Sequence, residues 1–138
     1  MPRATKLTPN LIVSSVEQSL SFYVDILGFE RGMTVPEQSP FVFAAVASGP
    51  VEIFFNDRST IAKESPQFGG KSLGGGNTMF IEVDGVDAFH DQVKDRVKIV
   101  MPILTQWYGM REFAIEDPDG YVITFAERVA APEPAGHA

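Results

Sequence analysis

The sequence predicts an α+β fold of two tandem modules, each with the order strand, helix and three strands (βαβββ), and three observations support this prediction. The pattern repeats: one helix is predicted to begin at Val16 and the other at Val86, 70 residues later. Each half contains one helical pattern and four extended patterns. A polar, glycine-rich stretch separates the halves. Since one helix covers only one face of a sheet, we expect a curved mixed sheet around a cleft, with the helices outside.

The first module begins with a β-branched run, Thr8–Val13, which predicts a strand. Ser15 and Gln18 form a capping-box pattern ahead of apolar residues at helical spacing. Gly28 suits the left-handed residue that ends a helix, so an amphipathic helix is predicted over Val16–Leu27. Three further strands are predicted at Phe29–Thr34, Phe41–Ala47 and Val51–Phe55.

The second module repeats this order, with a strand at Thr78–Val83 and a helix that opens at Asp84–Asp87 and continues to Val97. Its last two strands are joined by the turn sequence Asp117–Gly120. The three strands after the helix are predicted at Lys98–Leu104, Met110–Glu116 and Tyr121–Glu127.

The length of 138 residues fits one compact domain. We expect that domain over residues 1–128, with module one over about 6–56 and module two over about 77–128. Residues 57–76 contain five glycines and many polar residues, which is typical of a linker or a mobile flap. Residues 129–138, rich in proline and alanine, are expected to be a disordered tail.

Composition excludes several classes of protein. The net charge of −7 argues against binding a phosphate backbone, although it suits a cationic ligand. The absence of cysteine excludes disulfides, thiolate zinc sites and cysteine nucleophiles. No apolar run approaches the roughly 20 residues that span a bilayer, and Met1–Lys6 is too short and polar for a signal peptide. We therefore expect a cytoplasmic protein that binds neither nucleic acid nor membrane. Helix charges such as Glu17 and Asp25 are expected to face solvent.

Two segments resemble the vicinal oxygen chelate superfamily, which includes glyoxalases, bleomycin resistance proteins and extradiol dioxygenases. Residues 10–29 (NLIVSSVEQSLSFYVDILGF) are similar to its opening strand and helix, and residues 116–121 (EDPDGY) are similar to its last hairpin. Together with the linker and the duplication, the resemblance covers residues 6 to about 128. It implies the fold predicted above, whereas the members' activities range from metal-dependent enzymes to non-catalytic drug binding.

The resemblance also implies four sheet positions that hold a divalent metal in the enzymes of this superfamily, and these fall on Thr8, Glu52, Thr78 and Thr124. Only Glu52 is a usual ligand, because a threonine hydroxyl is a poor donor compared with imidazole or carboxylate. A catalytic metal site normally needs about three protein ligands. The two histidines, His90 in the second helix and His137 in the tail, lie on no predicted strand. We therefore expect no metal and no other cofactor.

The resemblance is closest to the bleomycin-resistance branch, which sequesters a drug without a metal or a chemical step. Residues 8–10 (TPN), residues 52–55 (EIFF) and Trp107 carry this similarity. It implies a homodimer whose N-terminal strands are exchanged, with clefts lined by aromatic and acidic residues. We therefore expect metal-independent binding of a small aromatic or cationic organic molecule and a role in antibiotic resistance.

Side-chain alternation along the strands selects the candidate ligand-binding residues. Glu52 shares a face with Phe54, and this face is expected to line the cleft. An inward carboxylate at Glu52 needs a partner, which is Arg111, a bound cation or water. Trp107 and Tyr108 can stack on a ligand or make cation–π contacts, the alternative being that Trp107 packs over an edge of the core. The candidate set is Asn10, Glu52, Phe54, Thr78, Phe80, Trp107, Tyr108, Arg111 and Thr124.

The binding hypothesis involves no catalytic residue, but two enzymatic alternatives remain open. In the first, a glyoxalase- or dioxygenase-like lyase or oxidoreductase holds its metal mostly with carboxylates, such as Glu52, Glu82 or Glu127. In the second, a metal-free lyase or isomerase uses Glu52 as a general base. Bound metal identifies the first. Loss of turnover with retained binding in Glu52→Gln identifies the second.

Overall fold

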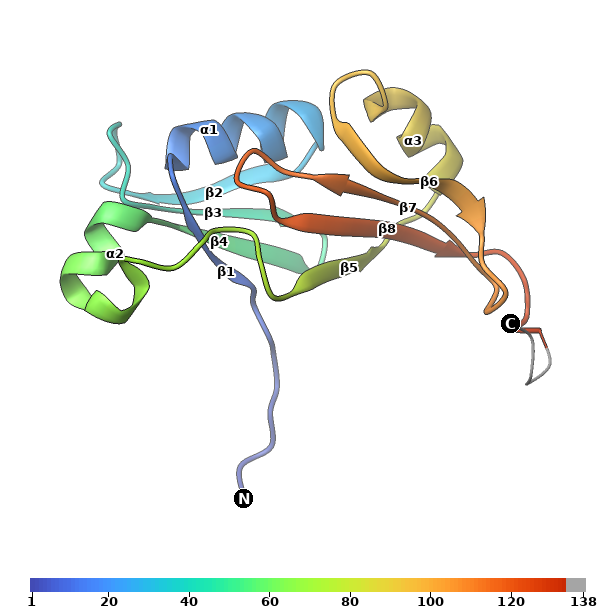
Figure 1. Cartoon of the computed structure of the whole chain (residues 1–138), viewed down its shortest axis with the longest axis horizontal. Coiled ribbons are helices and arrows are strands. Elements are labelled where there is room, and N and C mark those ends of the chain that lie inside the picture. The colour runs from blue at the N-terminus through green and yellow to red at the C-terminus, as the bar shows by residue number, and fades with distance from the viewer. Residues whose placement is uncertain (134–138) are drawn as a thin grey trace. The chain divides into compact units, whose positions relative to one another are not determined.

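The computed structural model describes residues 1–133, and within this range the strands form two four-stranded sheets, one in each module (Figure 1). Each sheet is mixed, because it contains one parallel pair of strands and two antiparallel pairs. The chain divides into two compact units, Met1–Leu73 and the part that begins at Gly74. The predicted α+β fold with two tandem βαβββ modules is therefore confirmed.

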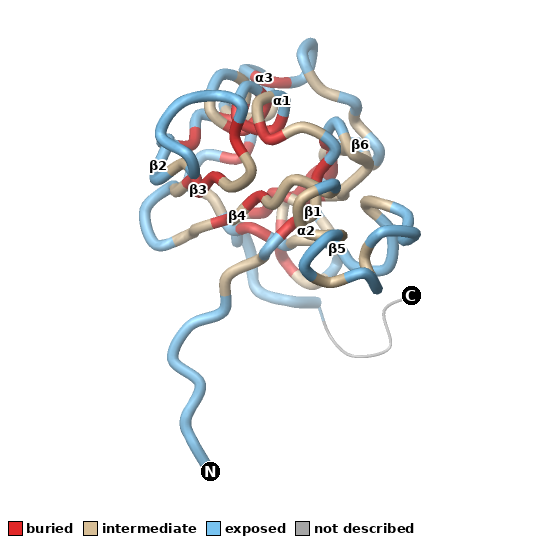
Figure 2. Tube along the Cα trace, turned by 90° about the vertical axis from the view of Figure 1, so that its left-hand side faces the viewer, coloured by how far each residue is buried: buried red, intermediate tan, exposed pale blue. Residues whose placement is uncertain are grey.

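The sheet of the first unit has the strand order β1-β4-β3-β2. Its strands are β1 (Asn10–Val13), β2 (Glu30–Val35), β3 (Phe43–Ser48) and β4 (Val51–Asp57). β1 lies parallel to β4, and the other neighbouring strands run antiparallel. Helix α1 (Val16–Leu20) packs on β3 and β4. Figure 2 shows the exposed N-terminal residues leading up to β1.

The first helix departs from the expected continuous α-helix. It begins as predicted at Ser15, whose hydroxyl accepts a hydrogen bond of 3.1 Å from the Gln18 amide. From Ser21 to Ile26 it continues as a π-helix, in which the Leu27 amide donates to the Phe22 carbonyl. This wider winding accompanies the burial of two adjacent aromatic residues, Phe22 and Tyr23. Gly28, with a φ of 81°, follows the helix as expected.

The glycine-rich segment between the modules carries secondary structure that the sequence analysis did not foresee. Helix α2 (Arg58–Glu64) starts after Asp57, whose carboxylate accepts a hydrogen bond of 3.1 Å from the Thr60 amide. A short 3₁₀ turn, Pro66–Phe68, follows it. α2 contacts β1 and β4, so the first part of this segment packs on the first unit rather than forming a free connection.

The sheet of the second unit repeats the arrangement with the order β5-β8-β7-β6. Its strands are β5 (Thr78–Glu82), β6 (Lys98–Thr105), β7 (Met110–Glu116) and β8 (Val122–Arg128). Helix α3 (Val86–Val93) packs on β7 and β8 (Figure 1). α3 ends at Val93 rather than at the predicted Val97, since the chain turns there toward β6.

The first residues of the expected tail are hydrogen-bonded. The amides of Val129 and Ala130 donate to the carbonyl of Gly109, and the Glu133 amide donates to the Trp107 carbonyl at 2.8 Å. This stretch therefore pairs with the loop between β6 and β7, whereas residues 134–138, including His137, lie outside the described range. No helix within residues 1–133 is long and apolar enough to cross a membrane.

Candidate functional site

Aromatic packing determines which way each strand residue of the first unit points. Tyr23, which has no exposed surface, contacts Phe55 with ring centroids 4.9 Å apart, so Phe55 faces the helix. Because side chains alternate along a strand, Glu52 and Phe54 point to the opposite face of β4. We call this face helix-free because it is the one that α1 does not cover, and both side chains are partly exposed on it.

Two further residues belong to the helix-free face of the first unit. Asn10 lies beside Phe54 in the parallel register of β1 and β4, and its side-chain oxygen accepts a hydrogen bond from the Asn56 amide group. Phe43 on β3 packs against Phe54 with ring centroids 5.2 Å apart. The face thus combines two aromatic rings, a pair of amides and the Glu52 carboxylate.

The partner of Glu52 in the first unit is Lys6, whereas Arg111, one of the three partners considered, binds Asp87 in the second unit. The Lys6 ammonium nitrogen lies 2.6 Å from Glu52 Oε1, and the two side chains are 60% and 30% exposed. The pairing follows from topology, because Lys6 precedes β1 and β1 runs beside β4. An ion pair exposed to this extent contributes little to stability.

The second unit also has a helix-free face that carries candidate residues. Phe125 contacts Phe89 of α3 with ring centroids 4.8 Å apart, which turns its neighbour Thr124 to the other side of β8. Thr124 pairs with Phe80 in the parallel register of β5 and β8. Phe80 is 54% exposed, an unusual state for a phenylalanine on a sheet. Thr78, two residues earlier on β5, shares this face and is exposed.

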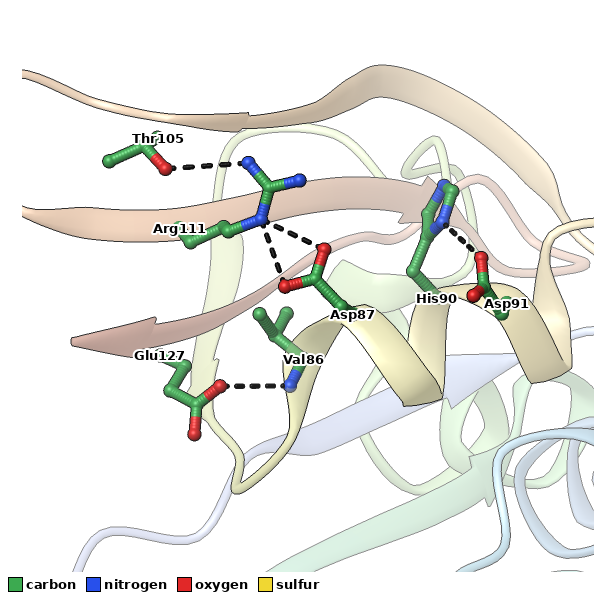
Figure 3. A network of polar contacts seen from close by, with 7 residues as sticks. All are labelled: Val86, Asp87, His90, Asp91, Thr105, Arg111 and Glu127. Carbon is green, nitrogen blue, oxygen red and sulfur yellow. Dashed lines mark hydrogen bonds and ion pairs between the residues drawn. The ribbon is translucent and has the colours of Figure 1, made fainter. Parts of the chain in front are cut away.

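Arg111 lies on the helix side of β7, away from the face that carries Thr124 (Figure 3). Its Nε atom is 2.9 and 3.0 Å from the two carboxylate oxygens of Asp87 at the start of α3. A third contact of 3.3 Å joins its guanidinium to the hydroxyl of Thr105. Phe113, on the same side of β7, packs on Phe89 of the helix. Arg111 therefore links the start of α3 to the sheet through hydrogen bonds and an ion pair. For this reason we no longer propose it as a ligand-binding residue.

Trp107 and Tyr108 lie at the tip of the β6–β7 hairpin, which backbone hydrogen bonds hold closed. The Gln106 amide donates to the Met110 carbonyl, and the Gly109 amide donates to the Gln106 carbonyl. The ring of Trp107 meets that of Tyr108 edge to face, with centroids 5.4 Å apart and an interplanar angle of 86°. Trp107 is 45% exposed, so a large part of the indole is accessible on this hairpin.

Glu112 is a residue of this region that the sequence analysis missed. It is only 3% exposed, and its Oε1 atom accepts a hydrogen bond from the Tyr108 hydroxyl. Burial, followed by this hydrogen bond and the nearby negative charge, raises the pKa of Tyr108 to about 12. Within residues 1–133, Glu112 Oε2 is buried without a hydrogen-bond partner. The available signal was an acid between Met110 and Ala114, two apolar residues on the same face of the strand.

The residues at the metal positions of related enzymes do not fit a metal. Three are threonines, and the fourth, Glu52, is paired with Lys6. Nowhere in residues 1–133 do three or more histidine, aspartate or glutamate side chains gather closely enough to hold an ion. Glu127 is committed to the start of α3, where the amides of Gly85 and Val86 donate to it and lower the pKa of its carboxyl group (Figure 3). We therefore derive no step through a metal.

A small polar pocket lies beside Glu127. It has a volume of about 270 Å³ and is lined by Glu82, Val83, Asp84, Glu127 and Arg128. Glu82 and Glu127 were the carboxylates considered as metal ligands in the second module, and here they border an open hollow at the end of the sheet rather than a closed ion site.

Comparisons with known proteins place these features in context. The sequence profile of the Glyoxalase/Bleomycin resistance protein/Dioxygenase superfamily matches residues 6–125. A bleomycin resistance protein of Geobacillus stearothermophilus is 29% identical over 131 residues, which cover 88% of this chain and 95% of that protein. A bleomycin resistance protein of Staphylococcus aureus shows the same identity and coverage.

Solved structures show the same likeness in three dimensions. A bleomycin-binding protein from Streptomyces verticillus, complexed with copper(II)-bleomycin, aligns with a TM-score of 0.62 and 25% identity, covering 96% of this chain and all of that one. A glyoxalase/bleomycin resistance protein/dioxygenase from Nocardioides aligns with a TM-score of 0.77 at 17% identity, covering 100% of this chain and 92% of that one. At such low identity, the second match concerns the fold alone.

Proposed function

The chain belongs to the Glyoxalase/Bleomycin resistance protein/Dioxygenase superfamily, and we propose that it binds and sequesters a small aromatic or cationic organic molecule of the bleomycin type. The proposed activity is binding alone, without a metal ion supplied by the protein and without a chemical step. The observation that carries it is the indole of Trp107, which is 45% exposed on a hydrogen-bonded hairpin. The similarity to bleomycin resistance proteins over 88% of the chain supports the choice of ligand class.

Aromatic surfaces supply the proposed affinity. Trp107 and Phe80 are 45% and 54% exposed, and the exposed part of a ring can stack on a planar ligand or attract a cation. In the first unit, Phe54 is a further candidate ring. Binding that covers an exposed ring removes apolar surface from water, which favours association.

Polar groups supply the proposed selectivity. Glu52 is paired with an exposed lysine, so a cationic group of the ligand can replace the Lys6 ammonium without a large loss of stability. Asn10, Thr78 and Thr124 lie on the same helix-free faces as the aromatic residues and offer hydrogen bonds. A net charge of −7 attracts cations over a longer range. The role in antibiotic resistance, the homodimer and the cytoplasmic location belong to the same proposal.

Calorimetric titration tests this function. The chelator-treated protein is titrated with metal-free bleomycin and, separately, with copper(II)-bleomycin, and saturable binding is expected with both. Trp107→Leu is expected to weaken binding by about tenfold or more, because an aromatic anchor at the centre of an interface is typically worth at least that much. Met33→Ala serves as the control, since Met33 is also an exposed apolar side chain (65%) but belongs to strand β2. No heat of binding with either form, or equal affinity of Trp107→Leu and wild type, would contradict the proposal.

A further inference from the structure

Glu112 is an acid that is only 3% exposed on the central strand pair of the second sheet. It lies on β7 opposite Leu104 of β6 and Ala126 of β8, and its strand neighbours Phe113 and Ala114 are buried. A carboxyl group in such surroundings lowers stability unless hydrogen bonds replace the water it has lost. Only one such bond is formed within residues 1–133, from the Tyr108 hydroxyl to Oε1, while Oε2 has none.

This partial satisfaction indicates that Glu112 does not serve stability. When a buried polar group is left unpaired, the fold bears the cost of its desolvation, and an apolar residue of similar size is often equal or better. What Glu112 does provide is a fixed acceptor for one hydroxyl. Tyr108 keeps its proton throughout the neutral range, as a tyrosine of ordinary pKa also does, so the donor is always available.

The backbone around Tyr108 is already immobilised by other contacts. The Arg128 guanidinium donates to the Tyr108 carbonyl at 3.0 Å, and the Glu133 amide donates to the Trp107 carbonyl at 2.8 Å. The contact with Glu112 therefore acts on the orientation of the Tyr108 ring rather than on the course of the loop. That ring and the indole of Trp107 in turn pack edge to face.

We infer that Glu112 is a positioning residue, which orients the Tyr108 ring and through it the Trp107 indole for ligand binding. The inference rests on the proposed function, because it assigns Glu112 a part in the same site. Holding a flexible aromatic side chain in its bound orientation before the ligand arrives reduces the entropy lost on binding. The orientation that Glu112 imposes on the Tyr108 side chain then explains why a buried acid that lowers stability is present at this position.

Fluorescence of Trp107 tests the inference directly, because it is the only tryptophan in the chain. The variants are Glu112→Leu, Tyr108→Phe, the double variant and Glu112→Gln, which retains an acceptor. Glu116→Gln, four residues along the same strand, is the control. In the ligand-free protein we expect lower Trp107 anisotropy in the first three variants, with Glu112→Gln close to wild type and Glu116→Gln unchanged.

Stability and affinity complete the test. The double variant is expected to unfold within a few degrees of wild type, since removing both partners of a buried hydrogen bond is nearly neutral. The same variant should bind metal-free bleomycin about tenfold more weakly in calorimetry. Unchanged Trp107 anisotropy in both Glu112→Leu and Tyr108→Phe would overturn the inference, and so would failure of Glu112→Gln to retain the wild-type signal. If the wild type binds no bleomycin while the anisotropy changes occur, the proposed function fails and the orienting role of Glu112 stands.

Discussion

Individual carboxylates of this protein do different work because their partners differ. Glu17, at the start of α1, accepts hydrogen bonds from the hydroxyl of Ser39 and the amide of Phe41, in the segment before β3. Glu52 meets an exposed lysine, and the buried Glu112 meets the half-buried phenol of Tyr108. Glu17 lies near solvent as expected, but helical periodicity could not show that a distant loop would donate hydrogen bonds to it.

Glu17→Gln is expected to lower the free energy of unfolding at pH 7 by about 1 kcal/mol, the scale of a hydrogen bond to a charged group at a partly exposed site. The hydrogen bonds from Ser39, first, and Phe41 lower the pKa of Glu17 in the folded protein. Its contribution is therefore complete above the unfolded value of 4.5 and disappears as the pH falls through the folded value. Urea unfolding at pH 7 and pH 3 measures this, with Glu30→Gln as an exposed control. Equal losses at both pH values would refute the assignment.

Glu52→Gln is expected to weaken the binding of metal-free bleomycin by about tenfold, because a charged acceptor for the ligand cation is lost. Glu116→Gln is a matched control, since Lys98 and Glu116 form another ion pair of 2.6 Å with similarly exposed side chains. Both variants should unfold at nearly the wild-type temperature. Calorimetric titration distinguishes them, and equal affinities for the two variants would remove Glu52 from the proposed site.

At the scale of elements, the β6–β7 hairpin depends on one glycine. Gly109 has a φ of 87°, and a Cβ atom there would overlap the carbonyl of Ala130. Gly28 has a similar φ of 81°, but nothing lies within 4 Å of its would-be Cβ atom. Replacing either glycine by alanine would strain the backbone, but only the replacement of Gly109 would also cause steric overlap. Comparing the two variants therefore distinguishes the two effects.

Gly109→Ala is accordingly expected to cost more stability than Gly28→Ala, for which the left-handed conformation alone accounts for about 1–2 kcal/mol. The added overlap should displace residues 129–133 from the hairpin and shift the fluorescence emission of Trp107. Urea unfolding and emission spectra of both variants provide the measurement. Equal destabilisation with an unchanged emission spectrum would show that the contact with Ala130 is not important.

Sequence patterns predicted elements well where a clear turn signal bounds them. The bounds of β7, Met110–Glu116, were predicted correctly ahead of the turn sequence Asp117–Gly120. Helix α2 was missed because glycines nearby outweighed the capping signal of Asp57. The π-helical winding after Leu20 has no periodicity signal of its own. For the candidate site, alternation placed Glu52, Phe54 and Thr124 on the helix-free faces, but it could not show that Arg111 would bind Asp87 or that Glu112 would be buried.

At the scale of the whole molecule, the two units share the same arrangement of sheet and helix. Each unit covers one face of a four-stranded sheet with a helix and leaves the other face to a mixture of aromatic and polar side chains. The duplication that the sequence predicted therefore repeats a sheet face with aromatic and polar side chains as well as a fold. Three of the four positions that the resemblance assigns to metal ligands hold threonine, which is why we propose binding rather than metal chemistry.

Thermal unfolding of the chelator-stripped protein with metal-free bleomycin, in the presence of excess EDTA, tests this central claim most directly. At a ligand concentration of about 100 times Kd, we expect bleomycin to stabilise the folded protein by about 2.7 kcal/mol and to raise its Tm accordingly. In Trp107→Leu, the same bleomycin concentration should raise the Tm much less. A Tm that does not change when bleomycin is added would contradict the proposed function. So would a Tm that rises only when Ni²⁺, Zn²⁺, Fe²⁺ or Mn²⁺ is added and no longer rises in Glu52→Ala, because the protein would then depend on a metal site.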